Sequence, residues 1–242
     1  MPSPSSSPTL NADGIAMEAL AGQLANDDEL KIQLSHRLHK EVAGGMVACT
    51  SLSEMLRHSL GQAEAASPAA KLHSELDSAL RQTLGVVRDI TEGLYPPVLK
   101  VFGFHAALQQ LVRSFTEAFG GSIMLQLNGN EPAFELGSRL NLFRLVETML
   151  HIVIEDSNAS WLEITCQCGE HECEVSIEHD GGSAVWSAPE TSSQVLKIEA
   201  RCGLLQARFE VSASGHADRT RCTLLAPLPS ADQLGAGALK LL

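Results

Sequence analysis

The sequence predicts an α+β protein in which an N-terminal helical hairpin precedes a two-layer α/β sandwich. Two observations support this fold class. Between Leu34 and Leu94, apolar residues recur in steps of three or four, which is the period of an amphipathic helix. After Pro96 and Pro97, short stretches with the alternation typical of strands are interspersed with further helical stretches. The two prolines therefore mark the boundary between the two parts.

The first helix of the hairpin is predicted from a stripe of apolar residues that begins at Leu34. A short amphipathic run at 15–24 precedes it, and the pattern leaves open whether this run belongs to the same helix. His39 lies just beside the stripe, where a partner helix can shield the imidazole on one side while the ring still reaches water. The stripe comprises Leu34, Leu38, Val42, Met46, Cys49, Leu52 and Leu56.

A second helix repeats this spacing and completes the hairpin. Ser67 is a suitable N-cap and Pro68 suits the first helical position, so the connection runs over 61–67. At about 1.5 Å per residue, each helix forms a rod of roughly 40 Å, and one hairpin alone leaves much of both stripes in water. We therefore expect two chains to pair into a dimeric four-helix bundle. The second stripe comprises Leu72, Leu76, Leu80, Leu84, Val87, Ile90 and Leu94.

The part after the prolines alternates between helices and strands. Helices on one face of a mostly antiparallel sheet make a two-layer α/β sandwich. The chain then divides into a disordered, Ser/Pro-rich N-terminus at 1–13, the hairpin at 14–99, the sandwich at 100–229 and a tail at 230–242. The predicted helices are 104–119, 138–154 and 193–206, and the predicted strands are 122–127, 161–168, 173–178, 208–214 and 221–226.

Composition and charge argue against several classes of partner. The chain has 242 residues, of which 44% are hydrophobic, and this is enough for a sizeable core. Its formal net charge is -12 at pH 7 and its pI is about 5.1, whereas nucleic acids and anionic membranes are bound by clustered Lys and Arg. The sequence has neither a secretory leader nor an apolar run of about 18 residues. We therefore expect a cytoplasmic protein without nucleic acid or membrane partners.

Six cysteines fit a reducing compartment. Cys166, Cys168 and Cys173 lie close together with His171 between them, which is a spacing compatible with a zinc site. In both predicted strands, however, these cysteines alternate with polar residues and share a face with aliphatic neighbours such as Leu162. We expect them to be buried as small hydrophobic residues, and we predict no metal site.

Three motifs lie in order along the chain: Leu38-His39-Lys40-Glu41-Val42 in the first helix, Gly93-Leu94-Tyr95-Pro96-Pro97-Val98-Leu99 at the hairpin exit, and Gly103-Phe104-His105-Ala106-Ala107-Leu108 after it. Over roughly residues 30–229 the chain thereby resembles the core of two-component sensor histidine kinases, the nitrate-sensor class in particular. The resemblance implies that the second part is similar to a Bergerat-type ATP-binding fold. It also implies that His39 matches the histidine that accepts a phosphoryl group and passes it to an aspartate of a response-regulator receiver domain.

The surroundings of His39, the predicted phosphoacceptor, depart from the family's pattern. The family usually has an acidic base directly after the histidine, where this chain has Lys40, and the glutamine associated with phosphatase activity is replaced near Gly44. Positive charge on Lys40 and Arg37 would favour a phosphoryl group through charge-assisted hydrogen bonds. Equally, Arg37 can simply pair with Glu41 at helical spacing, which contributes a few tenths of a kcal/mol.

His36 is the rival acceptor. Ser35-His36-Arg37-Leu38 is similar to the motif of the other major class of histidine kinases, in which the histidine follows a serine. That class requires a proline further on, and this chain has none at the corresponding place. His39 is therefore favoured.

The positions that would handle ATP depart most. Ile152 and Thr148 stand where the family has a magnesium-binding Asn and, a turn earlier, a Glu, and residues 192–205 lack the Gly-rich lid that cradles the triphosphate. His179 stands in place of the Asp that reads adenine. His179 and Asp180 look like a catalytic pair, but they precede two glycines after a strand, and turn chemistry explains them. We predict that ATP binding and ATP-driven autophosphorylation are lost and that no cofactor is bound.

Two classes of function agree with these residues. In the first, the chain is a dimeric histidine phosphotransferase that carries a phosphoryl group on His39 between receiver domains of response regulators, which supply any magnesium. In the second, it is an adaptor or inhibitor that binds a sensor histidine kinase or a receiver domain through the same bundle. An active kinase with an unusual nucleotide site is a third and weaker alternative. The histidine at the acceptor position favours the first.

Overall fold

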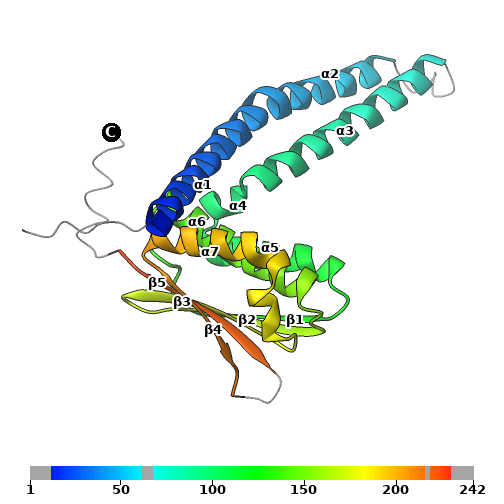
Figure 1. Ribbon diagram of the computed structural model, residues 1–242. Coiled ribbons are helices and arrows are strands. Elements are labelled where there is room, and N and C mark those ends of the chain that lie inside the picture. Colours follow the sequence, from blue (N-terminus) through cyan, green and yellow to red (C-terminus); the bar gives the residue numbers. More distant parts are fainter. Residues whose placement is uncertain (1–11, 61–67, 216–218, 230–242) are drawn as a thin grey trace, which may run out of the picture. The chain divides into compact units, whose positions relative to one another are not determined.

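The computed structural model describes residues 12–60, 68–215 and 219–229 (Figure 1). Predictions made for 1–11, 61–67 and 230–242, which include the hairpin connection and the tail, lie outside these residues. Contacts divide the described chain into two compact units, Asn26–Pro97 and the remainder, and each is described by itself. No helix in the described part of the chain is long and apolar enough to cross a bilayer.

The first arm of the hairpin is helical throughout. It consists of α1 (Ala12–Arg37), a π-helical segment η1 (Leu38–Ala43) and α2 (Gly44–Leu60). The run at 15–24 therefore belongs to the same helix as the residues that follow it. In η1 the backbone N–H of Gly44 donates to the carbonyl of His39, five residues earlier, and this bond defines the π-turn.

The second arm is α3 (Pro68–Leu94), which begins at the predicted proline and packs against α2 and η1. Small or polar residues are the ones buried between the arms. Ser35 donates its hydroxyl to the carbonyl of Thr91 over 3.3 Å, and Ala43 is buried on η1. Much of both apolar stripes remains exposed in the single chain, as predicted. Its exposed members are Leu34, Val42, Cys49, Leu52, Leu56, Leu72, Leu76 and Ile90.

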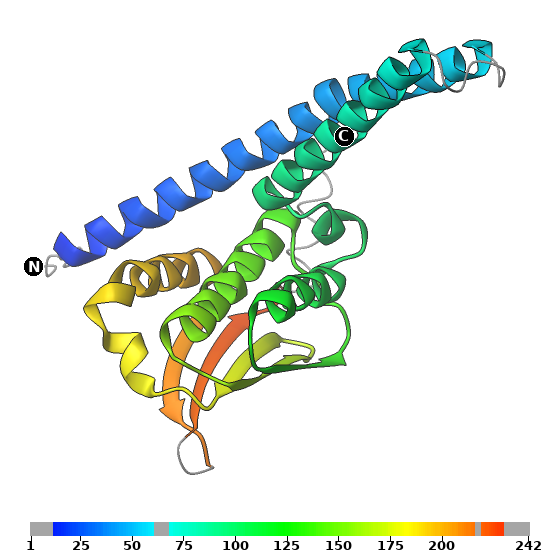
Figure 2. The same ribbon diagram turned by 90° about the vertical axis from the view of Figure 1, so that its right-hand side faces the viewer.

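A five-stranded mixed sheet forms one layer of the second unit (Figure 2). Its strand order is β1-β2-β3-β5-β4; β1 and β2 are parallel and the other three pairings are antiparallel. The sequence therefore predicted a mostly antiparallel sheet correctly. The strands are β1 (Ser122–Gly129), β2 (Trp161–Cys168), β3 (Glu172–His179), β4 (Arg208–Ala213) and β5 (Thr220–Pro227).

Helices cover one face of this sheet and make the second layer, which confirms the two-layer α/β sandwich (Figures 1 and 2). They are α5 (Phe104–Ala118), α6 (Leu136–His151) and α7 (Ser192–Leu205), and α6 packs against both others. The core is built from alternate strand residues, such as Leu162 and Ile164 on β2, and from apolar residues of α6 such as Leu142. The shorter elements are α4 (Pro97–Val101), the π-turn η3 (Ile152–Asp156), and two 3₁₀ turns, η4 (Ser183–Ser187) and η5 (Pro189–Thr191).

Candidate functional site

His39 is exposed on the surface of η1. The segment is held by packing against the second arm, since η1 contacts α3 and Ala43 is the buried residue of η1. π-Turns inside α-helices are rare, and they frequently occur at functional sites. Nothing in the sequence pattern predicted the π-turn, whereas the exposure of the His39 ring agrees with its predicted place beside the apolar stripe.

Two cationic residues lie near His39 in the sequence. Lys40 is exposed, and so is Arg37, whose Nε lies 3.6 Å from Oε1 of Glu41. Arg37 therefore forms the ion pair with Glu41 that helical spacing predicted. An exposed pair of this kind contributes only a few tenths of a kcal/mol to stability. Arg37 can therefore leave Glu41 at little cost. His36 is also exposed, so exposure alone does not separate it from His39.

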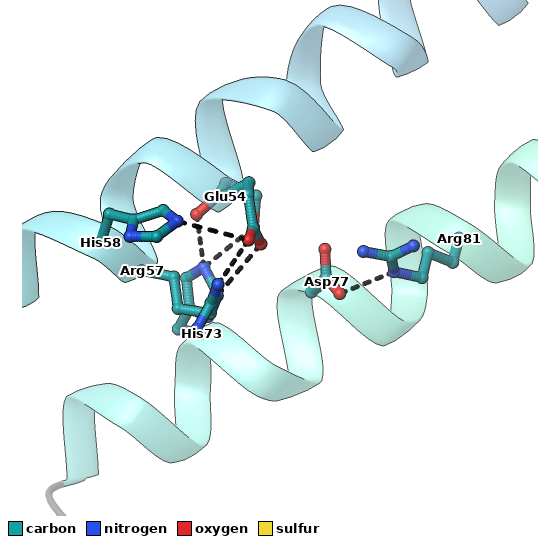
Figure 3. Close-up of polar contacts among 7 residues, drawn as sticks. Glu54, Arg57, His58, His73, Asp77 and Arg81 are labelled. Atoms are coloured by element: carbon teal, nitrogen blue, oxygen red, sulfur yellow. Dashed lines mark hydrogen bonds and ion pairs between the residues drawn. The ribbon is translucent and has the colours of Figure 1, made fainter. Parts of the chain in front are cut away.

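A polar network joins the arms further along the hairpin (Figure 3). The Nε2 atom of buried His73 on α3 lies 3.0 Å from Oγ and 2.7 Å from the carbonyl oxygen of Ser53 on α2. Beside it, Glu54 pairs with Arg57 and lies 3.8 Å from Nε2 of His58. The hydrogen bond from Arg57 lowers the pKa of the Glu54 carboxyl. Within this network, the contact of His73 with Ser53 is the one that links the two helices.

An open cleft of about 610 Å³ lies between α2 and α3. Arg81 and Arg88 of α3 bring positive charge to its wall, and Arg81 is held by Asp77, whose Oδ2 is 2.7 Å from its Nε (Figure 3). The full lining is Thr50, Ser51, Glu54, Arg81, Leu84 and Arg88. The sequence analysis did not single out this cleft, because it depends on which faces of the two helices meet.

The position expected to read adenine is closed. His179 is 0% exposed; its Nε2 lies 3.9 Å from Sγ of Cys222, and its ring is 6.5 Å from that of Trp186. Burial lowers the pKa of His179, although the neighbouring Asp180 opposes this shift, so the ring is neutral at pH 7. Because the ring is fully buried, it does not present an acceptor to a ligand in the way that an exposed carboxylate would.

Asp180 acts as a cap for the start of β2, a role that the turn interpretation did not specify. Its Oδ1 accepts the backbone N–H groups of Ser160 at 2.8 Å and Trp161 at 3.0 Å, and its Oδ2 accepts the Ser160 hydroxyl at 2.6 Å. Partial burial raises the pKa of this carboxyl, but these hydrogen bonds outweigh it and the pKa is lowered. Asp180 is therefore occupied by structure and is not a catalytic partner of His179.

We expect Asp180→Ala to lower the free energy of unfolding by about 1–2 kcal/mol at pH 7, because two backbone donors lose a charged acceptor. Since the pKa of Asp180 is lowered on folding, its contribution is fully present above the unfolded pKa of about 3.9 and is lost as the pH falls through the folded value. Denaturant melts at pH 7 and in strong acid measure this difference. An equal destabilisation at both pH values would contradict the assignment.

The positions expected to hold magnesium and triphosphate also lack suitable groups. Ile152 is 0% exposed, and the Thr148 hydroxyl donates to the carbonyl of Arg144 within its own helix. Where the family has a lid, α7 is a continuous helix, as the sequence predicted, and it is tied to α6, since Asn141 donates to the carbonyl of Arg201 and accepts from its guanidinium, at 3.0 and 2.9 Å. These side chains do not fit a magnesium-bound triphosphate.

Comparison with known proteins gives neighbours of similar fold only. No family model matches the chain, and no curated protein matches it. Among solved structures, the histidine kinase AdeS of Acinetobacter baumannii is 15% identical with a TM-score of 0.43, over 69% of this chain and 98% of that one. The blue-light activated histidine kinase EL346 of Erythrobacter litoralis is 16% identical with a TM-score of 0.46, over 66% of this chain and 51% of that one.

The ATP-binding domain of PrrB from Mycobacterium tuberculosis is 12% identical with a TM-score of 0.41, over 51% of this chain and 93% of that one. These three solved structures are thus histidine kinases or a domain of one. Likeness at TM-scores below 0.5 decides nothing about chemistry, which has to be inferred from the chain's own residues.

Proposed function

We propose that this chain is a histidine phosphotransferase of a two-component phosphorelay, with His39 as the phosphoacceptor. The observation that carries the proposal is the exposed imidazole of His39, held in a π-turn of a helical hairpin, with exposed Lys40 and Arg37 near it in the sequence. A relay acceptor must be reachable by a second protein, and it gains from nearby positive charge when the phosphoryl group arrives.

The step is a nucleophilic substitution at phosphorus. A ring nitrogen of His39 attacks an aspartyl phosphate on a receiver domain, so that an N–P bond forms while the acyl O–P bond breaks and the aspartate carboxylate leaves. The proton on the other ring nitrogen passes to solvent. Lys40 and Arg37 stabilise the charge of the phosphoryl group on His39, and the receiver domain supplies the magnesium. A second receiver aspartate then takes the group by the reverse chemistry.

We infer that the chain does not phosphorylate itself from ATP. The residues at the matching positions support this, because Ile152 and His179 are buried and the Asp180 carboxylate is held by Ser160 and Trp161. Titration of the chain with magnesium–ATP in a calorimeter is the test. Heat of binding at millimolar nucleotide, together with label from ATP on the protein, would instead favour a kinase with an unusual nucleotide site.

The proposal includes a homodimer, since the exposed apolar stripes need a partner surface, and a cytoplasmic location. The six cysteines, which are free thiols in the structure, support a reducing compartment.

Incubation with a panel of phosphorylated receiver domains tests the function. We expect label to move from at least one receiver to the chain and from the chain to an unphosphorylated receiver. If receiver domains bind the chain but no label moves, the result supports the second candidate function, an adaptor or inhibitor. One observation favours that second candidate: the polar cleft lined by Glu54, Arg81 and Arg88 offers a partner protein a binding surface without any need for His39.

A further inference from the structure

Three thiols and an imidazole meet at one end of the β2–β3 hairpin. Cys166 and Cys168 come from β2, Cys173 from β3, and His105 from the first turn of α5. Cys168 and Cys173 are directly opposite each other in the antiparallel register. The three cysteines are buried, as the alternation predicted, but they contact one another and do not merely fill space.

The sulfur atoms have nearly the spacing of metal ligands. Sγ of Cys166 lies 3.8 Å from Sγ of Cys168 and 3.9 Å from Sγ of Cys173. In a tetrahedral site with Zn–S bonds of about 2.3 Å, two sulfurs lie about 3.8 Å apart. The Cys168–Cys173 distance is 2.8 Å, so a small side-chain rotation has to lengthen it before the triangle matches.

His105 brings an imidazole nitrogen close to two of these thiols. One of its ring nitrogens and the sulfurs of Cys166 and Cys168 lie within 4.8 Å of one another. The Nε2 atom is buried and has no hydrogen-bond partner among the described residues, while Nδ1 lies 3.5 Å from Oε2 of Glu131. A carboxylate on the far side of an imidazole is the usual outer partner of a metal-bound histidine, because it fixes the tautomer and aims the free nitrogen at the metal.

The backbone holds Glu131 in this position. Its Oε1 accepts the N–H of Phe104 and its Oε2 accepts the N–H of His105 at 3.0 Å, so the carboxylate caps the start of α5. Gly103 leaves the necessary room: its φ is +89°, and a Cβ there would lie 2.5 Å from Oε1 of Glu131. The outer partner of His105 is therefore fixed by backbone groups and does not depend on a flexible contact.

Cysteine binds a metal as the thiolate, so the thiols of the cluster would lose their protons to a bound metal.

We propose that Cys166, Cys168, Cys173 and His105 form a structural Zn²⁺ site that ties the β2–β3 hairpin to the start of α5. Four protein ligands fill a tetrahedral shell and leave no open position for catalysis. The thiol protons pass to solvent on binding, so zinc is released in acid. His171, which the sequence placed between the cysteines, is exposed at the turn; the histidine that joins them is His105, from the motif after the hairpin exit. The site is independent of the proposed phosphotransfer.

Metal titration of the full chain tests the site. The protein is reduced, stripped with a chelator and titrated with Co²⁺ and then Zn²⁺. We expect one Co²⁺ per chain, a thiolate-to-cobalt charge-transfer band with the intense visible bands of tetrahedral cobalt, displacement by Zn²⁺, and a higher Tm with Zn²⁺. Cys166→Ser and His105→Gln should lose these bands, and Glu131→Gln should weaken Zn²⁺ binding about 10–100-fold.

Cys222→Ser is the matched control, because Cys222 is also a fully buried thiol of the same sheet, on β5. It should bind cobalt as the wild type does. The site is refuted if the reduced wild type takes up no metal, or if His105→Gln and Cys166→Ser bind as tightly as the wild type does. If the reduced chain binds no cobalt and the oxidised chain forms a Cys168–Cys173 disulfide, the cluster is a redox-active thiol pair and not a metal site.

Discussion

A chain carrying His39→Ala is expected to accept no phosphoryl label from a phosphorylated receiver domain, whereas the wild type becomes labelled. Alanine has no nucleophile, and the effect is therefore a complete loss and not a partial one. His39 is exposed, so the substitution removes no packing and should leave the melting temperature unchanged within a degree or two. The measurement is transfer of radioactive phosphate, with the acid lability of the product as evidence of an N–P bond.

His36→Ala is the matched control, because His36 is an exposed histidine one turn away on the same arm. It should retain the labelling of the wild type. Label that survives His39→Ala and disappears with His36→Ala would assign the acceptor to His36. If each of the two variants is still labelled, neither His39 nor His36 alone is the required phosphoacceptor.

The regular elements were predictable where one periodicity holds without interruption. β2 covers the predicted 161–168 because its alternation is unbroken, and α3 begins at the predicted Pro68, which suits a first helical position. The same property of proline explains a miss. Pro96 and Pro97 were interpreted as a stop, yet Pro97 opens the short helix α4, since a proline that ends one helix can start another.

The sites were predictable only as far as they are local in sequence. The exposure of His39 follows from helical spacing on one arm, and so does the Arg37–Glu41 pair. The contact between His105 and the cysteines depends on α5 packing on β1, the neighbour of β2, and on Glu131, 26 residues further on, which caps that helix. A search for ligands at short spacing selects His171 for this reason, and no pattern within one element reveals His105.

The exposed apolar residues near the hairpin connection provide the test of the dimer. On α2, Leu52 is 64% and Met55 66% exposed, and on α3, Leu72 is 67% and Leu76 50% exposed. Full burial of one such side chain contributes about 1.5–3 kcal/mol. We therefore expect the double variant Leu52→Glu with Leu76→Glu to weaken self-association at least about a hundredfold, because four carboxylates would enter an apolar interface in each dimer. Sedimentation equilibrium measures the mass.

Leu196→Glu is the control for adding charge to an exposed leucine, since Leu196 is 46% exposed on α7, in the other unit. It should sediment as a dimer, like the wild type. A wild type that is monomeric at every concentration would contradict the bundle, and a double variant that stays dimeric would place the interface elsewhere. If His39 accepts its phosphoryl group from a separate receiver domain, the monomeric double variant should still be labelled, because the ring attacks without help from the second chain.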